Sequence, residues 1–198
     1  MNHYYCKNWE PLEDTKRIQW DLAGGCLSFY TAAGIFSKDR VDSGTRWLVK
    51  HMTREEPCAS FLDLGCGYGA VGIALSRLGW CHDAYYCDVN FKALRLARKN
   101  LRVNRVKGRI HCGEGADALR DHVFDGVALN PPIRAGLDAV LCLIRGGLRT
   151  LKPKGRFYLV MRTRQGALRL KKDPTWAGLS FLEIGRDGGY RVFRMEAP

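Results

Sequence analysis

The sequence lacks the features of a membrane-spanning or exported protein. No apolar stretch approaches the length of about eighteen residues that a membrane helix needs. The best candidate, residues 70–78, is short and already carries Arg77. The first six residues show no charged segment followed by an apolar one, which is the pattern of a secretion signal. We therefore expect a cytoplasmic protein that makes no membrane contact.

Paired metal-binding cysteines are also missing. The 8 cysteines form no CxxC pair, and no histidine is placed to complete a zinc site with them. Several lie inside apolar runs, where a thiol packs like a small core residue. We expect free thiols in a reducing compartment and no metal, with disulfides as the alternative. The cysteines are Cys6, Cys26, Cys58, Cys66, Cys81, Cys87, Cys112 and Cys142.

Acidic residues are few relative to basic ones. The chain has 20 Asp and Glu against 32 Lys and Arg, which gives a formal net charge of +12. Such an excess suits a polyanionic partner, because each phosphate that is neutralised releases condensed counterions. A charge that serves only solubility is the alternative. The balance favours a nucleic acid as partner.

The first part of the chain has the pattern of a β-hairpin. Residues 17–22 and 26–30 are strand-like and flank a small turn at residues 23–25. Ser43 is then placed to cap a helix that ends before Pro57. We therefore divide the chain into an N-terminal β appendage, residues 1–42, and a main domain, residues 43–198.

From residue 59 onwards strands alternate with helices. Alternation of this kind predicts a mostly parallel sheet with right-handed crossovers and helices on both faces. The expected architecture is an α/β, Rossmann-like sheet of seven strands, plus the short N-terminal hairpin. The predicted strands are residues 59–64, 84–87, 109–112, 126–129, 156–160, 179–184 and 190–195, with helices at 70–78, from Asn90 and at 137–150.

One helix has an apolar side and a basic side. Asn90 is placed to cap it, and Ala93, Leu94, Ala97 and Leu101 form the apolar side. The basic side is either a solvated face or a surface that contacts RNA. Its members are Lys92, Arg95, Arg98, Lys99 and Arg102.

A glycine-rich turn follows the first predicted strand of the main domain. The glycines at Gly65, Gly67 and Gly69 let the backbone turn tightly and let a ligand approach closely. Asp63 stands just before them, where an acid is unfavourable beside a pyrophosphate and favourable beside an ammonium group. The motif therefore predicts S-adenosylmethionine rather than a dinucleotide.

Two further strand ends complete the predicted cofactor site. Asp88 ends the next strand, where a carboxylate accepts hydrogen bonds from ribose hydroxyls. After the third strand, Glu114 or the amides beside it could bind the adenine. The predicted cofactor-binding residues are Asp63, Gly65, Cys66, Gly67, Tyr68, Gly69, Asp88, Val89, Glu114, Gly115, Ala116 and Asn130.

Asn130, Pro131, Pro132 and Ile133 follow the strand at residues 126–129 and form the predicted catalytic motif. Two successive prolines fix φ and leave a rigid wall of carbonyl acceptors, to which Asn130 adds a side-chain carbonyl. Acceptors held in this way can bind both hydrogens of a planar amine and orient its lone pair toward a methyl donor. The motif has no cysteine nucleophile for carbon methylation and no lysine for 2′-hydroxyl methylation.

With these residues the chain resembles the small-methyltransferase-domain family of class I methyltransferases. It is most similar to the catalytic half of the small-subunit ribosomal RNA guanine-N2 methyltransferases and to their single-domain archaeal relatives. The matching segments are residues 34–37, 42–45, 63–69, 88–90, 130–136 and 188–192. The two-domain enzymes carry a further domain ahead of the catalytic one, where this chain has about forty residues.

The resemblance implies roles for three more residues. Phe36 and Thr45 would line the cofactor or base pocket, and Arg134 would face the substrate. Ile133 replaces the aromatic residue found in many adenine-N6 and glutamine-N5 relatives, which shifts the expectation toward guanine-N2.

The predicted function is methylation of an exocyclic base amine in RNA, namely guanine-N2 of ribosomal RNA or of a ribosomal particle, by a monomer or homodimer. Adenine-N6 or tRNA guanine-N2 methylation is the first alternative. A protein glutamine-N5 methyltransferase is the second alternative. A non-catalytic RNA-binding module is the third.

Overall fold

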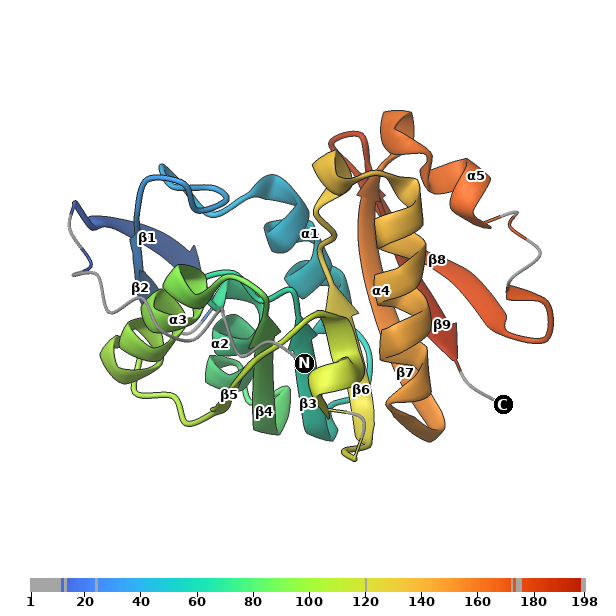
Figure 1. Cartoon of the computed structure of the whole chain (residues 1–198), viewed down its shortest axis with the longest axis horizontal. Helices are drawn as coiled ribbons and strands as arrows, with labels where there is room; N and C mark the ends of the chain where they lie inside the picture. Colours follow the sequence, from blue (N-terminus) through green and yellow to red (C-terminus); the bar gives the residue numbers. More distant parts are fainter. Residues whose placement is uncertain are drawn as a thin grey trace.

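Seven strands form one mostly parallel sheet, and a separate two-stranded hairpin lies beside it (Figure 1). The structure is a computed structural model that describes residues 12, 14–23, 25–119, 121–171, 173 and 176–196. The hairpin strands are β1 (Lys16–Leu22) and β2 (Gly25–Thr31). The sheet strands are β3 (Cys58–Leu64), β4 (Cys81–Asp88), β5 (Arg109–Cys112), β6 (Phe124–Leu129), β7 (Leu151–Arg162), β8 (Ser180–Asp187) and β9 (Tyr190–Glu196).

The direction in which the chain adds strands to the sheet changes between β3 and β6, which are parallel neighbours. The strand order is β5-β4-β3-β6-β7-β9-β8, so the chain moves outward through β4 and β5 and then returns to β6. Leu64 pairs with Leu129 in parallel register. The segments that follow β3 and β6 therefore leave the sheet side by side, at the crevice where open α/β sheets bind their ligands.

Helices cover both faces of the sheet. Helices α1 (Ser43–Met52), α2 (Ala70–Arg77) and α3 (Phe91–Val103) share one core cluster, while α4 (Leu137–Arg149) and α5 (Ala167–Lys171) belong to the other. In β3, Phe61 joins the first cluster and Leu62 joins the second, because alternate strand residues face opposite sides. The seven-stranded sheet with a β-hairpin confirms the predicted architecture.

The hairpin β1–β2 packs onto helix α3 through two asparagines. Asn104 accepts a hydrogen bond from the Ser28 amide at 3.0 Å and donates to the Ser28 carbonyl at 2.8 Å. Asn100 pairs in the same way with Tyr30 and also donates to the Tyr68 carbonyl at 2.9 Å. Since Tyr68 belongs to the glycine-rich loop, these amides connect the hairpin, α3 and that loop.

The sequence predicted most elements but missed several short ones. The strands β4, β6 and β7 extend beyond their predicted bounds, and three 3₁₀ turns and α5 were not predicted. Asp42 caps α1 in place of Ser43, because its carboxylate accepts a hydrogen bond from the Thr45 amide. The 3₁₀ turns are η2 (Gly115–Leu119), η3 (Ile133–Ala135) and η4 (Thr163–Gln165).

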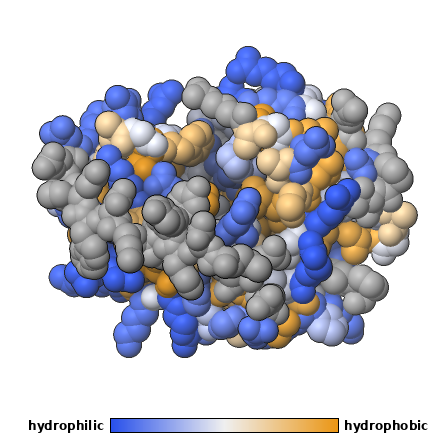
Figure 2. Space-filling view, in the orientation of Figure 1, coloured by the Kyte–Doolittle hydropathy of each residue, from blue (hydrophilic) through white to orange (hydrophobic). Residues whose placement is uncertain are grey.

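On the face shown in Figure 2, apolar side chains gather over α4, with hydrophilic ones around them. Among the described residues, no helix is both long and apolar enough to cross a membrane. Ile18, Trp20, Leu27 and Phe29 of the hairpin belong to the same core cluster as α1–α3. The division of the chain at residues 42 and 43 stays a prediction.

Candidate active site

The loop after β3 has a backbone that favours glycine at three positions. The φ angles of Gly65, Gly67 and Gly69 are +65°, +55° and +87°, a region that side chains with a Cβ rarely adopt. A Cβ at Gly67 would meet no atom within 4 Å, so the side of the loop that faces outward is open. The loop then enters α2, whose first amides point toward this end of the sheet.

Asp88 fastens this loop to the end of β4. Its Oδ2 accepts a hydrogen bond from the Gly67 amide at 2.8 Å, and its Oδ1 accepts one from the Asn90 amide at 2.8 Å. The residue is half-buried, so its carboxylate also borders the solvent side of the crevice. Each oxygen retains a further lone pair that can accept a hydroxyl, as a ribose site requires.

Asp63 is a buried carboxyl at the start of the same loop. Only 3% of its surface is exposed, and its Oδ2 accepts a hydrogen bond from the Gly72 amide in α2 at 2.9 Å. Burial, opposed by the hydrogen bond from the Gly72 amide and assisted by the nearby charge of Asp88, raises the pKa of Asp63 to about 7. No cation among the described side chains pairs with it. A cationic ligand in the loop would compensate this carboxylate.

These residues fit S-adenosylmethionine. The open loop can approach a ligand backbone closely, Asp63 supplies negative charge, and Asp88 supplies acceptors at the neighbouring strand end. Gly113 donates its amide to the Asp88 carbonyl, which brings the segment after β5 to the same edge. In that segment Glu114 is exposed and Ala116 is buried. Of the other predicted cofactor residues, Cys66 and Tyr68 are buried, Val89 is exposed and Gly115 has a positive φ.

Asn130 is held by two side chains from helix α1. Its Nδ2 donates to Asp42 Oδ2 at 3.2 Å and to Thr45 Oγ1 at 3.0 Å. A carboxylate only accepts hydrogen bonds, so the atom of Asn130 that meets Asp42 must be the amide nitrogen. Both hydrogens of Nδ2 are used by these two bonds. The remaining polar atom, Oδ1, is therefore the one that can accept from a substrate.

Gly44 makes this arrangement possible. A Cβ at this position would lie 2.8 Å from Asp42 Oδ2 and 3.0 Å from the ring of Tyr190. The sequence alone carries no signal for the roles of Asp42 and Gly44, although both belong to the segment 42–45 that resembles the family. Helix α1 thus uses its capping residue, Asp42, both to start the helix and to fix Asn130.

The two prolines are placed differently from each other. Pro131 is buried and Pro132 is exposed. Their carbonyl oxygens accept hydrogen bonds from the amides of Ile133 and Ala135, which closes the turn η3. Each carbonyl keeps only its second lone pair for a substrate, so the predicted wall of acceptors is partly occupied by the turn itself.

The structure places the predicted substrate residues at different depths. Phe36 is 66% exposed, whereas Thr45 is 6% exposed and contacts Asn130. Ile133 is half-buried against the core cluster of α4. The side chain of Arg134 lies outside the part that the structure describes, as does Cys6. The roles predicted for these residues stay predictions.

The seven described cysteines are free. Burial raises the pKa of Cys66 and, to about 12, that of Cys87, so neither thiol near the loop ionises to a nucleophile at neutral pH. No group of three metal-ligating side chains occurs in the described residues.

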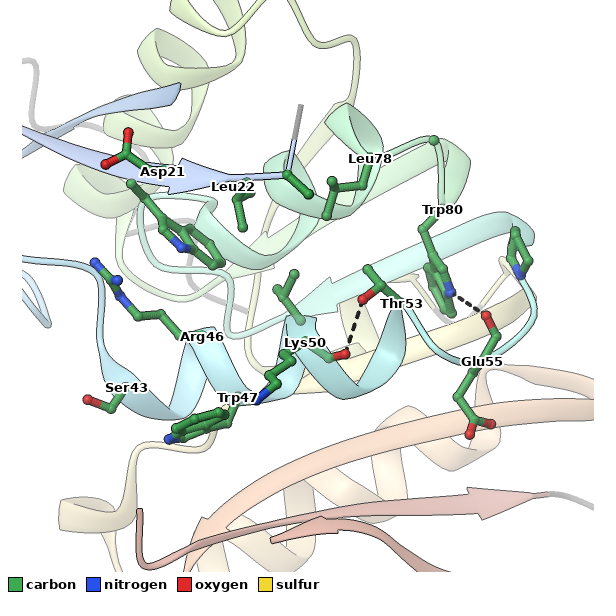
Figure 3. Close-up of a pocket in the computed structure, with 15 residues that line it drawn as sticks. Asp21, Leu22, Ser43, Arg46, Trp47, Lys50, Thr53, Glu55, Leu78 and Trp80 are labelled. Atoms are coloured by element: carbon green, nitrogen blue, oxygen red, sulfur yellow. Dashed lines mark hydrogen bonds between the residues drawn. The ribbon is translucent and has the colours of Figure 1, made fainter. Parts of the chain in front are cut away.

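A groove lies apart from the predicted cofactor residues. It has a volume of about 770 Å³ and runs between β1, α1 and the end of α2 (Figure 3). Arg46, Trp47 and Lys50 line it from α1, Asp21 from β1 and Glu55 from the segment after α1. Ser43, which lines the groove, lies between Asp42 and Thr45, the two residues that hold Asn130.

Comparisons with known proteins agree with this fold. A family model described as the methyltransferase small domain matches residues 26–193. The uncharacterized protein YbxB of Bacillus subtilis is 29% identical over 169 residues, which cover 83% of each chain. Ribosomal RNA small subunit methyltransferase C of Escherichia coli K12 is 30% identical over 155 residues, which cover 76% of this chain and 45% of that enzyme.

Solved structures share the fold. The T. thermophilus 16S rRNA N2 methyltransferase RsmC, in complex with AdoMet and guanosine, superposes with a TM-score of 0.79 at 22% identity. The match covers 93% of this chain and 51% of that chain. A methyltransferase from Pyrococcus furiosus has a TM-score of 0.61 at 18% identity, over 74% of this chain and 79% of its own. This chain therefore spans about half the length of its two ribosomal RNA methyltransferase relatives.

Proposed function

Because the chain belongs to the methyltransferase small domain family, whose members use S-adenosylmethionine, we propose that it methylates an exocyclic base amine in RNA. The target is guanine-N2 of ribosomal RNA, free or in a ribosomal particle of the cytoplasm. Support comes from the relatives named for ribosomal RNA methylation, from the net charge of +12 and from the site at the end of β6.

The observation that carries the proposal is the fixed orientation of Asn130. An exocyclic amine has two hydrogens to donate, so its site needs acceptors held in place. Asp42 and Thr45 bind both hydrogens of the Asn130 amide and leave Oδ1 as its acceptor for a substrate. The second lone pair of the Pro131 carbonyl is a further acceptor on the same segment.

In this site the protein positions the reacting amine. Asn130 and Pro131 accept the two N–H bonds, which holds the plane of the amine and directs the nitrogen lone pair toward the cofactor side of the crevice. S-adenosylmethionine supplies a highly reactive methyl group, so the protein contributes mainly orientation and exclusion of water. The amine proton is lost after transfer, and no strong base is needed before it.

The residues at the carboxyl ends of β3 and β4 would bind the cofactor. The glycine-rich loop would enclose the amino-acid part, with the Asp63 charge compensating its ammonium group. Asp88 would accept the ribose hydroxyls with lone pairs that the Gly67 and Asn90 amides leave free. Glu114, which is exposed, would reach the adenine from the segment after β5.

Transfer of tritiated methyl to RNA tests the proposal. Purified protein is incubated with labelled S-adenosylmethionine and total RNA that lacks the modification, and labelled nucleosides are identified after digestion. We expect label in N2-methylguanosine, which Asn130→Ala reduces by about 10²- to 10³-fold. Label in N6-methyladenosine would overturn the choice of base, and label only in protein glutamine would overturn the RNA substrate.

A further inference from the structure

Helix α3 and the segment after it carry a dense set of basic residues. Residues 89–113 contain eight Lys and Arg and no Asp or Glu. This set is called the α3 basic surface from here on. Its members are Lys92, Arg95, Arg98, Lys99, Arg102, Arg105, Lys107 and Arg109.

Few of these charges are neutralised within the protein. Arg109 pairs with Asp83, and Arg95 also has an interaction partner. For Arg98, Arg102 and Arg105, no carboxylate of the described residues lies within ion-pair distance. Like charges three or four positions apart on a helix repel one another. This repulsion destabilises the helix, so the stability of the fold does not explain why so many of these residues are basic.

The charges lie on the solvent side of the helix. Arg98, Arg102 and Arg105 are exposed, whereas Leu94 and Leu101 on the opposite side are buried in the core. The rise of an α-helix places Lys92 and Arg102 about 15 Å apart along its axis. In Figure 2 hydrophilic side chains project from the left and lower-left margin, where α3 and the following segment lie in Figure 1.

The α3 basic surface is continuous with the segment that leads to the active site. Lys92 donates to the Ala33 carbonyl at 3.1 Å, and Lys99 lies 3.4 Å from the centre of the Tyr30 ring. Phe36, three residues beyond Ala33, is 66% exposed. An RNA strand can thus contact basic groups on α3 and an exposed aromatic ring before it reaches the site, a combination typical of RNA recognition.

We propose that the α3 basic surface binds the phosphate backbone of the RNA segment that flanks the methylated nucleotide. The proposal rests on the proposed function, since it assumes an RNA substrate. Charge complementarity distinguishes this surface from the groove of Figure 3, whose lining combines Arg46 and Lys50 with Asp21 and Glu55. A polyanion would meet both signs of charge in the groove and only positive charge on α3.

A triple substitution with a matched control tests the proposal. Arg98→Gln, Arg102→Gln and Arg105→Gln remove three exposed charges from the surface and retain side-chain length. The control removes three exposed charges that lie outside α3 and the segment after it, beside the starts of β3 and β7, through Arg54→Gln, Arg149→Gln and Lys154→Gln. Binding of a labelled single-stranded RNA is measured for each protein over a range of salt concentrations, together with methyl transfer.

We expect the α3 variant to bind RNA more weakly, with its slope of log K against log salt reduced by about 2, since each phosphate contact contributes about 0.7. The control variant keeps the wild-type slope, and Arg→Lys at the same three positions restores RNA binding. S-adenosylmethionine affinity stays at the wild-type value in every variant, which shows that the domain is folded.

Equal RNA affinity and equal salt slope for wild type and the α3 variant would overturn the proposal. An equal loss in the α3 and control variants would also overturn it, because net charge alone would then explain binding. Failure of the proposed function gives a different result: the wild-type protein itself would bind cofactor and transfer no methyl to RNA.

Discussion

The ends of β3 and β6 lie next to each other in the sheet, but they are built in different ways. The β3 end is made of residues close in sequence: in the glycine-rich loop the Gly67 amide donates to Asp88, and in α2 the Gly72 amide donates to Asp63. The β6 end depends on α1, because Asn130 is oriented by side chains 88 and 85 positions earlier. The cofactor half is therefore local in sequence, while the substrate half is assembled by the fold.

This comparison predicts separable effects. Changes at the β6 end should alter turnover and leave cofactor affinity intact. Changes at the β3 end should lower cofactor affinity and leave turnover at saturating cofactor intact. The following four predictions test that separation in order of expected size.

Asn130→Asp should have the largest effect. The new carboxylate would face Asp42, and two like charges in contact raise the pKa of the pair and turn the side chain away. We expect turnover to fall by about 10²- to 10³-fold at neutral pH, in the range for loss of one positioned polar group. Activity should recover as pH falls, because the introduced carboxyl, once protonated, can donate to Asp42. Turnover against pH measures this, and a variant as active as wild type at pH 8 would contradict it.

Asp88→Ala should weaken the cofactor half. It removes the acceptor of the Gly67 and Asn90 amides and the proposed ribose contact. Hydrogen bonds to charged groups contribute about 1.5–3 kcal/mol, so cofactor affinity should fall by about 10- to 100-fold. Turnover at saturating cofactor should stay near wild type. Calorimetry gives the affinity, and a loss of turnover without a loss of affinity would contradict the separation.

Asp63 should make cofactor binding depend on pH. Its pKa of about 7 means that a cation can pair with it only after proton loss. S-adenosylmethionine affinity should therefore rise by about tenfold between pH 6 and pH 8, with proton release on binding. In the cofactor-free protein the stability of the fold has the opposite pH dependence, since it decreases as pH rises. The protonated carboxyl stabilises the fold fully below its unfolded pKa of about 3.9, and this contribution is lost as pH rises through 7.

The control for this effect is Asp63→Asn, whose neutral amide should remove the pH dependence. An affinity that rises equally with pH in the variant would assign the effect to another group.

Thr45→Val should have the smallest effect of the four. Valine keeps the shape of threonine but cannot accept the 3.0 Å hydrogen bond from Asn130, which then retains only Asp42. A neutral hydrogen bond contributes about 0.5–1.5 kcal/mol, so turnover should fall by about 2- to 12-fold with unchanged cofactor affinity. Thr45→Ser keeps the hydroxyl and should restore turnover. Equal turnover of the valine and serine variants would show that the hydroxyl does not position Asn130.

The sequence predicted the β3 end more completely than the β6 end. Glycine spacing and the acids at strand ends are local patterns, so Gly67, Asp88 and their strands could be placed from sequence. The contact between Asp42 and Asn130 has no local pattern, since it depends on how α1 packs beside β6. The packing of the hairpin through Asn100 and Asn104 escaped prediction for the same reason, because a helical asparagine is usually solvated.

The most direct test of the account is turnover and cofactor affinity measured side by side for Asn130→Ala. If Asn130 orients the substrate amine, S-adenosylmethionine affinity will match wild type while methyl transfer to RNA falls by about 10²- to 10³-fold. If the variant transfers methyl at the wild-type rate, the amine is not held by Asn130 and the account of the β6 end is wrong.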